Sequence, residues 1–160
     1  MNIDLIGVPQ DLGAGRRGVD MGPSAIRLAG LSEKLQDIGL SVSDAGDLAS
    51  EGLEVLTIEN PKLRYLPEIL ACVNKLSTSV EKTLDEGNFP LVLGGDHSIA
   101  IGTVGGVAAH YRKKQRRIGL LWIDTHGDMN TDETTPSGNI HGMPLAALLG
   151  RGHDSLIPVS

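Results

Sequence analysis

The sequence has little cysteine and few aromatic side chains, and these shortages exclude some classes of protein. Cys72 is the only cysteine among 160 residues, so neither an internal disulfide framework nor a thiolate metal cluster can form. Aromatic residues make up 2% of the chain, whereas hydrophobic residues make up 40% and charged residues 21%. The rest of the composition is that of an ordinary globular protein, and a chain of this length is expected to form one domain.

Positive charge and long hydrophobic runs are also scarce. Lysine and arginine number 14 against 20 aspartate and glutamate residues, which gives a net charge of −6. Nucleic acid and anionic membrane surfaces are therefore not expected as partners, and a cationic substrate suits the charge better. No run approaches the ~18 apolar residues that suggest a membrane span, and the first residues lack the basic start of a signal peptide. The cytoplasm is the expected location.

Apolar segments with strand and helix periods alternate along the chain. Strands are predicted at residues 3–8, 40–45, 89–93 and 117–124, and the last two are expected to be buried because their apolar residues are continuous. Helices are predicted from Gly22-Pro23-Ser24 to Gly39 with a break near Gly30, and at residues 67–86, 98–111 and 142–149. This alternation predicts an α/β fold, a three-layer α-β-α arrangement with a mostly parallel sheet.

Residues 13–18, Gly-Ala-Gly-Arg-Arg-Gly, match the glycine pattern of dinucleotide-binding folds. In those folds the helix opens within the glycines, so that its N-terminus meets the pyrophosphate. Here the helix start signal comes only at Pro23, and the acidic residue about 20 positions on, Asp37, falls inside a predicted helix. A glycine-rich loop at the surface or at the edge of a cleft is the preferred interpretation.

Two predicted strands are followed directly by side chains that can bind a metal. His97 follows one strand within Gly-Gly-Asp-His-Ser, and Asp124, His126 and Asp128 follow the next within Asp-Thr-His-Gly-Asp. Open α/β sheets bind ligands at the carboxyl ends of their strands, so both groups are expected at one rim. Asp124 and His126 share a face of extended chain, and the intervening glycine allows Asp128 to return to the same place. These nitrogen and oxygen donors suit Mn²⁺ or a similar divalent ion, and carboxylates can bridge two ions.

A long polar loop follows these side chains. Its neutral groups can hold a substrate carboxylate, or they can serve the turns and caps of the loop itself. These groups belong to Asn130, Thr135, Ser137 and Asn139. His141 stands at the start of the next predicted helix, where it can be a proton shuttle beside a metal-activated water or an ordinary loop histidine.

The motifs resemble those of the arginase family of ureohydrolases, in the same order and over nearly the whole chain. Residues 15–27, Gly-Arg-Arg-Gly-Val-Asp-Met-Gly-Pro-Ser-Ala-Ile-Arg, resemble the family's N-terminal signature. Residues 94–98 and 124–128 resemble its first two metal motifs. Residues 137–144, Ser-Gly-Asn-Ile-His-Gly-Met-Pro, resemble the arginase form of the following loop.

The resemblance implies a binuclear manganese site that hydrolyses L-arginine to L-ornithine and urea by a hydroxide bridging the metals. The implied metal ligands are His97, Asp124, His126 and Asp128, with Asp124 bridging. Asp128 and His141 would be catalytic, with His141 transferring a proton. The residues implied to bind the amino-acid end of the substrate are Asn130, Thr135, Ser137 and Asn139. The resemblance also implies a homo-oligomer, a trimer or a hexamer, that serves arginine metabolism such as the urea cycle.

The chain departs from the family in its length. Family chains are about double this length, and a later Ser-x-Asp-x-Asp motif supplies further carboxylate ligands, whereas this sequence contains no Asp-x-Asp. Four ligands cannot fill two manganese shells, and strands expected in the middle of a sheet would become open edges. Residues 1–160 are therefore interpreted as the N-terminal part of a single ureohydrolase domain, with little or no activity alone.

Two alternatives to arginase activity stay open. Another ureohydrolase, of the agmatinase or formimidoylglutamase type, would share the metal motifs without needing a carboxylate-binding loop. The chain could instead be an inactive fragment that binds metal weakly or serves as an assembly partner. Such a fragment would hold at most one Mn²⁺ ion, whereas an intact active site would hold two.

Overall fold

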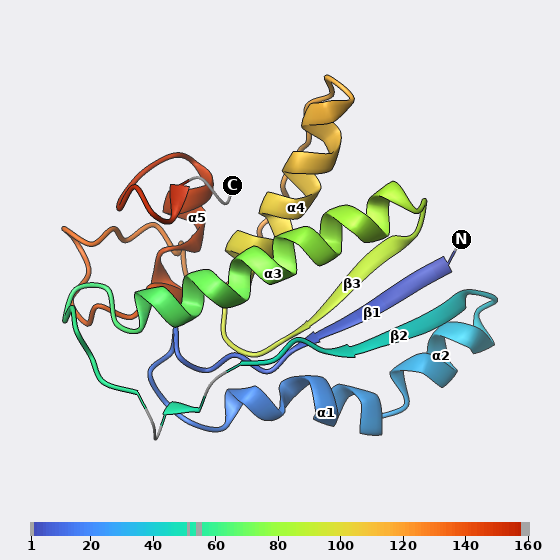
Figure 1. The fold of residues 1–160 in the computed structure, drawn as a ribbon. Coiled ribbons are helices and arrows are strands. Elements are labelled where there is room, and N and C mark those ends of the chain that lie inside the picture. The colour runs from blue at the N-terminus through green and yellow to red at the C-terminus, as the bar shows by residue number, and fades with distance from the viewer. Residues whose placement is uncertain (1, 51, 54–55, 158–160) are drawn as a thin grey trace.

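Three parallel strands form the sheet at the centre of the fold (Figure 1). The computed structural model describes residues 2–50, 52–53 and 56–157. β1 (Asn2–Val8) lies between β2 (Ser41–Asp47) and β3 (Phe89–Gly94). Leu5 and Ile6 of β1 point to opposite faces of the sheet, and both are buried. β1 is therefore covered on both faces, as is usual for a parallel strand.

Helices cover both faces of this sheet (Figure 1). α1 (Gly22–Leu28) and α2 (Leu31–Asp37) lie on one face, and α3 (Leu66–Asp85) lies on the other. α4 (Ile99–Lys113) packs against α3, and its C-terminal end projects away from the sheet. The arrangement confirms the predicted three-layer α/β fold with a parallel sheet.

The predicted break in the first helical region is present. Pro23 stands in the first turn of α1, where its missing N–H has no helical partner to lose. Gly30 separates α1 from α2 with a φ of 81°, a left-handed conformation that costs glycine little. Gly39 ends the region in the same conformation, with a φ of 85°.

One face of α3 supplies much of the hydrophobic core. Ile69, Val73, Leu76 and Val80 are spaced at the helical period, and each is fully buried. Cys72 lies beside them in the core, and burial raises the pKa of its thiol to about 11. Its thiol therefore stays protonated and has no role as a nucleophile at neutral pH.

Loops from distant parts of the sequence are anchored on α3. Leu12, Leu63, Ile140 and Met143 are buried in one cluster with the first turns of that helix. Ile140 belongs to a short 3-10 helix, Ile140–Gly142, that precedes α5 (Pro144–Leu148), and another 3-10 turn, Val19–Met21, precedes α1. Ile140 and Met143 therefore anchor the C-terminal end of the polar loop predicted to carry the site.

Two predictions about strands are wrong. Residues 117–124 form no strand, and within them Leu121 and Ile123 are 82% and 86% exposed, because no described strand pairs with the segment. β3 does pair with β1, in register from Ile3 opposite Phe89 to Val8 opposite Gly94. The prediction that β3 is buried is wrong, however. Among its apolar side chains only Leu93 is buried, because β3 lies at an edge of the sheet.

Among the helices that the structure describes, none combines the length and the apolar character needed to cross a membrane.

Candidate metal centre and substrate cavity

Three of the predicted ligands meet at one point of the structure. His97 stands in the turn between β3 and α4, and its Nδ1 lies 2.9 Å from Asp124 Oδ2 and 2.7 Å from Asp128 Oδ2. One donor atom from each of these side chains lies within 4.8 Å of the others. The group therefore joins residues almost 30 positions apart in the sequence, at the carboxyl end of β3 where the α/β rule places a ligand.

Asp128 has an unusual backbone conformation that α5 stabilises. Its φ is 46°, which is uncommon for a residue with a side chain. Its carbonyl oxygen accepts hydrogen bonds from the N–H groups of Leu145 and Ala146, at 3.1 and 3.2 Å, at the start of α5. These bonds offset the cost of the left-handed conformation and turn the Asp128 carboxylate toward His97.

His126 lies beside the group rather than in it. Its backbone N–H donates to Asp124 Oδ1 at 2.7 Å, and its ring Nδ1 lies 3.1 Å from the same oxygen. The backbone bond is the main reason that the pKa of the Asp124 carboxyl is lowered, with the imidazoles of His126 and His97 adding to the effect. The His126 side chain is 76% exposed and is not among the donors that converge.

Trp122 is a member of the site that the sequence analysis did not identify. Its ring stacks on the imidazole of His97, with the ring centres 4.5 Å apart and the planes inclined by 21°. Such stacking restricts the orientation of the imidazole. The only signal in the sequence is that Trp122 lies two residues before Asp124, on the same side of an extended chain.

The geometry of these side chains fits a divalent cation. Asp128 Oδ2 is buried and, although His97 Nδ1 lies 2.7 Å away, the two atoms lack the geometry of a hydrogen bond. His97 Nδ1 faces carboxylate oxygens of Asp124 and Asp128, yet a ring nitrogen carries at most one proton and cannot donate fully to both. A cation placed among these atoms would remove both defects, and the donor set of imidazole and carboxylate is one that divalent metals accept.

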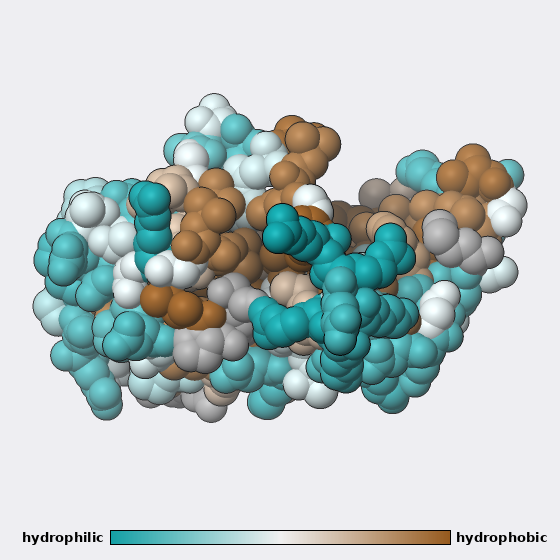
Figure 2. Space-filling view, turned by 90° about the horizontal axis from the view of Figure 1, so that it is seen from above, coloured by the Kyte–Doolittle hydropathy of each residue, from teal (hydrophilic) through white to brown (hydrophobic). Residues whose placement is uncertain are grey.

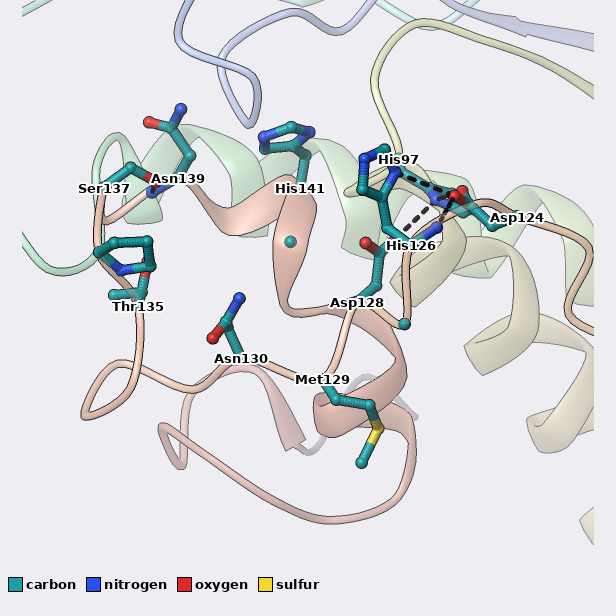
Figure 3. Close-up of a pocket in the computed structure, with 13 residues that line it drawn as sticks. His97, Asp124, His126, Asp128, Met129, Asn130, Thr135, Ser137, Asn139 and His141 are labelled. Carbon is teal, nitrogen blue, oxygen red and sulfur yellow. Dashed lines mark hydrogen bonds and ion pairs between the residues drawn. The ribbon is translucent and has the colours of Figure 1, made fainter.

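A cavity of about 700 Å³ opens beside the candidate ligands (Figure 3). Each of the nine site residues singled out in the sequence lines it. They are His97, Asp124, His126, Asp128, Asn130, Thr135, Ser137, Asn139 and His141. In Figure 3 the candidate ligands lie at one end, Thr135, Ser137 and Asn139 lie at the other, and Asn130 and His141 lie between them.

The four neutral residues of the loop differ in how free their side chains are. Ser137 Oγ only accepts a hydrogen bond, from the Asn139 N–H at 3.2 Å, so its own proton is available to a ligand. Asn130 Oδ1 accepts from Thr134 at 3.2 Å, which leaves the Asn130 amide N–H groups available. Thr135 is buried, and its Oγ1 closes a turn by accepting from the Gly138 N–H at 2.9 Å.

Asn139 is the most fully occupied of the four. Its amide nitrogen donates to the Ala14 carbonyl at 3.0 Å, and its amide oxygen accepts from Arg64 at 3.3 Å. Arg64 and Lys62 also bind the backbone of the loop, through the Gly138 and Thr135 carbonyls. These contacts could not be predicted from sequence spacing, because they join segments that lie more than 70 positions apart.

The arginase family profile matches residues 1–156 of the chain. The arginase of Bacillus subtilis (strain 168) is 55% identical over 155 residues, which are 97% of this chain and 50% of that protein. A crystal structure of arginase from Bacillus cereus has a TM-score of 0.89 at 56% identity and covers 98% of this chain and 50% of that one. An arginase from Entamoeba histolytica in complex with L-ornithine has a TM-score of 0.86 at 35% identity over 99% of this chain and 52% of that one. The chain thus spans about half the length of the relatives it matches.

Proposed function

The chain belongs to the arginase family, and from this membership we propose that it supplies ligands and a substrate-binding loop to a manganese enzyme that hydrolyses L-arginine to L-ornithine and urea. One observation carries the proposal. His97, Asp124 and Asp128 converge at one end of a cavity whose other end bears the neutral donor Ser137, with the Asn130 amide between the two ends. A cationic group and a carboxylate at opposite ends of one small substrate would suit this arrangement.

Residues 1–160 are proposed to be the N-terminal part of a single ureohydrolase domain. The ligands proposed from this chain are His97, Asp124, His126 and Asp128, with Asp124 bridging two Mn²⁺ ions. Because four side chains cannot complete two manganese shells, the whole protein would supply further ligands. That protein is proposed to be a cytoplasmic homo-oligomer, a trimer or a hexamer, that acts in arginine metabolism such as the urea cycle.

The places of the residues in the cavity support the roles proposed for them. Mn²⁺ ions, when bound, would lower the pKa of water at the ligand end and so favour its attack on the guanidinium carbon of the substrate. Asn130 and Ser137 would donate hydrogen bonds to the substrate carboxylate and hold the guanidinium group toward the ligands. Thr135 and Asn139 would keep the loop in place, as their hydrogen bonds indicate.

His141 is placed to move the proton that the reaction requires. When the bond between the guanidinium carbon and the ornithine nitrogen breaks, that nitrogen needs a proton to leave as an amine. His141 lines the cavity between its two ends, and an imidazole exchanges protons near neutral pH. Asp128 would act beside it by accepting hydrogen bonds at the ligand end.

Urea release by the whole protein tests the proposal, with Mn²⁺ present and after chelation. His97→Ala should abolish both the Mn²⁺-dependent urea release and the binding of Mn²⁺ measured by calorimetry. His153→Ala is the matched control, because His153 lies in a loop and the hydrogen bond of its ring is to the Ser155 N–H, outside the cavity. The 160-residue chain alone should release little urea, and near-normal turnover by it would contradict the proposed division of ligands.

A further inference from the structure

The glycine-rich turn at residues 13–15, which we call the glycine strap, joins two walls of the cavity. The Gly13 carbonyl accepts a hydrogen bond from the backbone N–H of His141 at 3.2 Å. The next carbonyl, of Ala14, accepts from the side-chain amide of Asn139 at 3.0 Å. The strap therefore holds the segment that carries His141. This segment lies about 125 positions further along the chain.

Asp96 holds the strap from the opposite side. Its carboxylate is 5% exposed and accepts from two backbone N–H groups, those of Ala14 at 3.0 Å and Ser98 at 2.9 Å. The bond from Ser98 closes a turn around His97, so it fixes the backbone of the proposed ligand. One buried carboxylate thus binds both the His97 turn and the strap, and hydrogen bonds to an ionised acceptor are among the stronger ones.

The backbone of Gly13 packs directly against the Asp96 carboxylate. A Cβ atom added to Gly13 would lie 2.5 Å from Asp96 Oδ1 and 2.7 Å from Ser98 Oγ, closer than atoms pack. The strap can therefore approach Asp96 only because residue 13 has no side chain. This close approach explains why residue 13, the first position of the glycine pattern at residues 13–18, is glycine. The proposed function involves no dinucleotide that would otherwise require it.

We propose that Asp96 is a positioning residue that couples the placement of His97 to that of His141 through the glycine strap. The inference rests on the proposed function for the roles of the two histidines. The connection consists of four segments in contact: the His97 turn, the Asp96 carboxylate, the strap, and the backbone of His141. Proton transfer requires that the acid and the ligand end of the cavity keep a fixed separation, and this connection supplies it.

Two variants test the coupling by different means. Asp96→Asn keeps the shape of the side chain but replaces one acceptor oxygen with an N–H donor, so it cannot accept from both Ala14 and Ser98. Gly13→Ala changes no charge and pushes the strap away from Asp96. Gly119→Ala is the matched control, because a Cβ at Gly119 has no neighbour within 4 Å.

The readout is the set of histidine imidazole signals in the carbon–proton NMR spectrum of the 160-residue chain. Both variants should shift the signals of His97 and His141 and leave those of His110 and His153 in place, and Gly119→Ala should shift none. Mn²⁺ affinity, from the paramagnetic resonance signal of the free ion, should fall about 10-fold in both variants, as is usual when a group that orients a ligand is lost.

Two outcomes would overturn the coupling. In one, His97 shifts in both variants while His141 stays unchanged. In the other, all histidine signals shift together, which would show that Asp96 serves only the general stability of the fold. Failure of the proposed function would look different: the unmodified chain would bind no Mn²⁺, while the imidazole signals could still report whether His97 and His141 move together.

Discussion

At the scale of single residues, the proposed role of Ser137 is to bind the substrate, not to take part in bond breaking. Its hydroxyl proton is not engaged in a hydrogen bond with the described residues, and it lines the cavity opposite the candidate ligands. Ser137→Ala should raise the KM for L-arginine about 10-fold or more, because a hydrogen bond to a carboxylate is lost. Hydrolysis of agmatine, which has no carboxylate, should be unaffected, so a steady-state comparison of the two substrates measures the effect. An equal loss for both substrates would contradict the assigned role.

Arg27 is a residue whose contribution depends on pH. Its guanidinium donates to both carboxylate oxygens of Asp44, at 2.7 and 2.9 Å, and to Asp47 at 2.6 Å, so it ties α1 to the end of β2. The hydrogen bonds from Arg27 are the main reason that the pKa of the Asp44 carboxyl is lowered from its ordinary 3.8. Stability from this pair is therefore complete above pH 3.8 and is lost as the pH falls through the lower pKa of the folded state.

Asp44→Asn tests this dependence. At pH 7 the variant should be less stable by about 1 kcal/mol, a modest value because the pair is partly exposed and water screens it. As the pH falls below 3.8 the gap should shrink, and once Asp44 is protonated in the folded state the two proteins should unfold at the same denaturant concentration. Urea unfolding over a series of acidic pH values measures the gap, and a gap that stays constant would show that the charge of Asp44 is irrelevant.

Some residues of the candidate site could be predicted from the sequence and others could not. His97, Asp124 and Asp128 were predictable because each comes shortly after an apolar segment, and short-range spacing decides where such side chains point. Trp122 and Arg64 were not, because their contacts depend on how separate segments pack. The hydrogen bond from the Asn139 amide could likewise not be predicted, because the Ala14 carbonyl that accepts it lies 125 positions earlier in the sequence.

At the scale of secondary structure, glycines decide how closely α4 approaches α3. A Cβ at Gly102 would lie 2.5 Å from the Val73 carbonyl oxygen, and one at Gly106 would lie 2.4 Å from that of Ser77. Both neighbours are backbone atoms of α3, which cannot move aside without displacing the helix. These helices in turn support the His97 turn, which begins α4.

Gly102→Ala should therefore have two opposing effects on the free energy of unfolding, one from helix propensity and one from packing. Propensity alone would stabilise the protein by about 1 kcal/mol, because alanine is the better helix former. Overpacking against Val73 costs typically 1–3 kcal/mol, and the backbone contact places this site near the upper end, so a net loss of about 2 kcal/mol is expected. Chemical denaturation measures it, with Gly119→Ala as a control that should change stability little. Stabilisation by Gly102→Ala would show that the helices can separate at small cost.

The helices were more predictable than the strands for a physical reason. The apolar stripe of α3 and the left-handed Gly30 act locally, so sequence spacing is enough to place them. A strand needs a partner, and residues 117–124 have the composition of a strand but pair with no strand among the described residues. The same reason explains why β3 is an edge strand although its sequence is continuous and apolar.

At the scale of the whole molecule, apolar side chains are exposed at the edge strand β3 and in the segment after α4. Phe89 of β3 is 49% exposed, and Leu121 and Ile123 are exposed almost completely. Figure 2 shows brown apolar surface beside the hydrophilic end of α4 that projects toward the viewer. The segment after α4 also has the backbone groups of an unpaired strand, because it forms no ladder with the described strands. Exposed strand edges with apolar side chains favour pairing with another chain.

The 160-residue chain should therefore self-associate at micromolar concentrations and above. Replacing Leu121 and Ile123 together by lysine should shift the chain toward the monomer, because charged side chains on an edge oppose pairing. Leu28→Lys is the control, since Leu28 is 89% exposed on α1, away from this segment, and its replacement should leave association unchanged. Light scattering across a dilution series measures the mass. If the double variant and the control behaved alike, general surface hydrophobicity rather than the open edge would be responsible for the association.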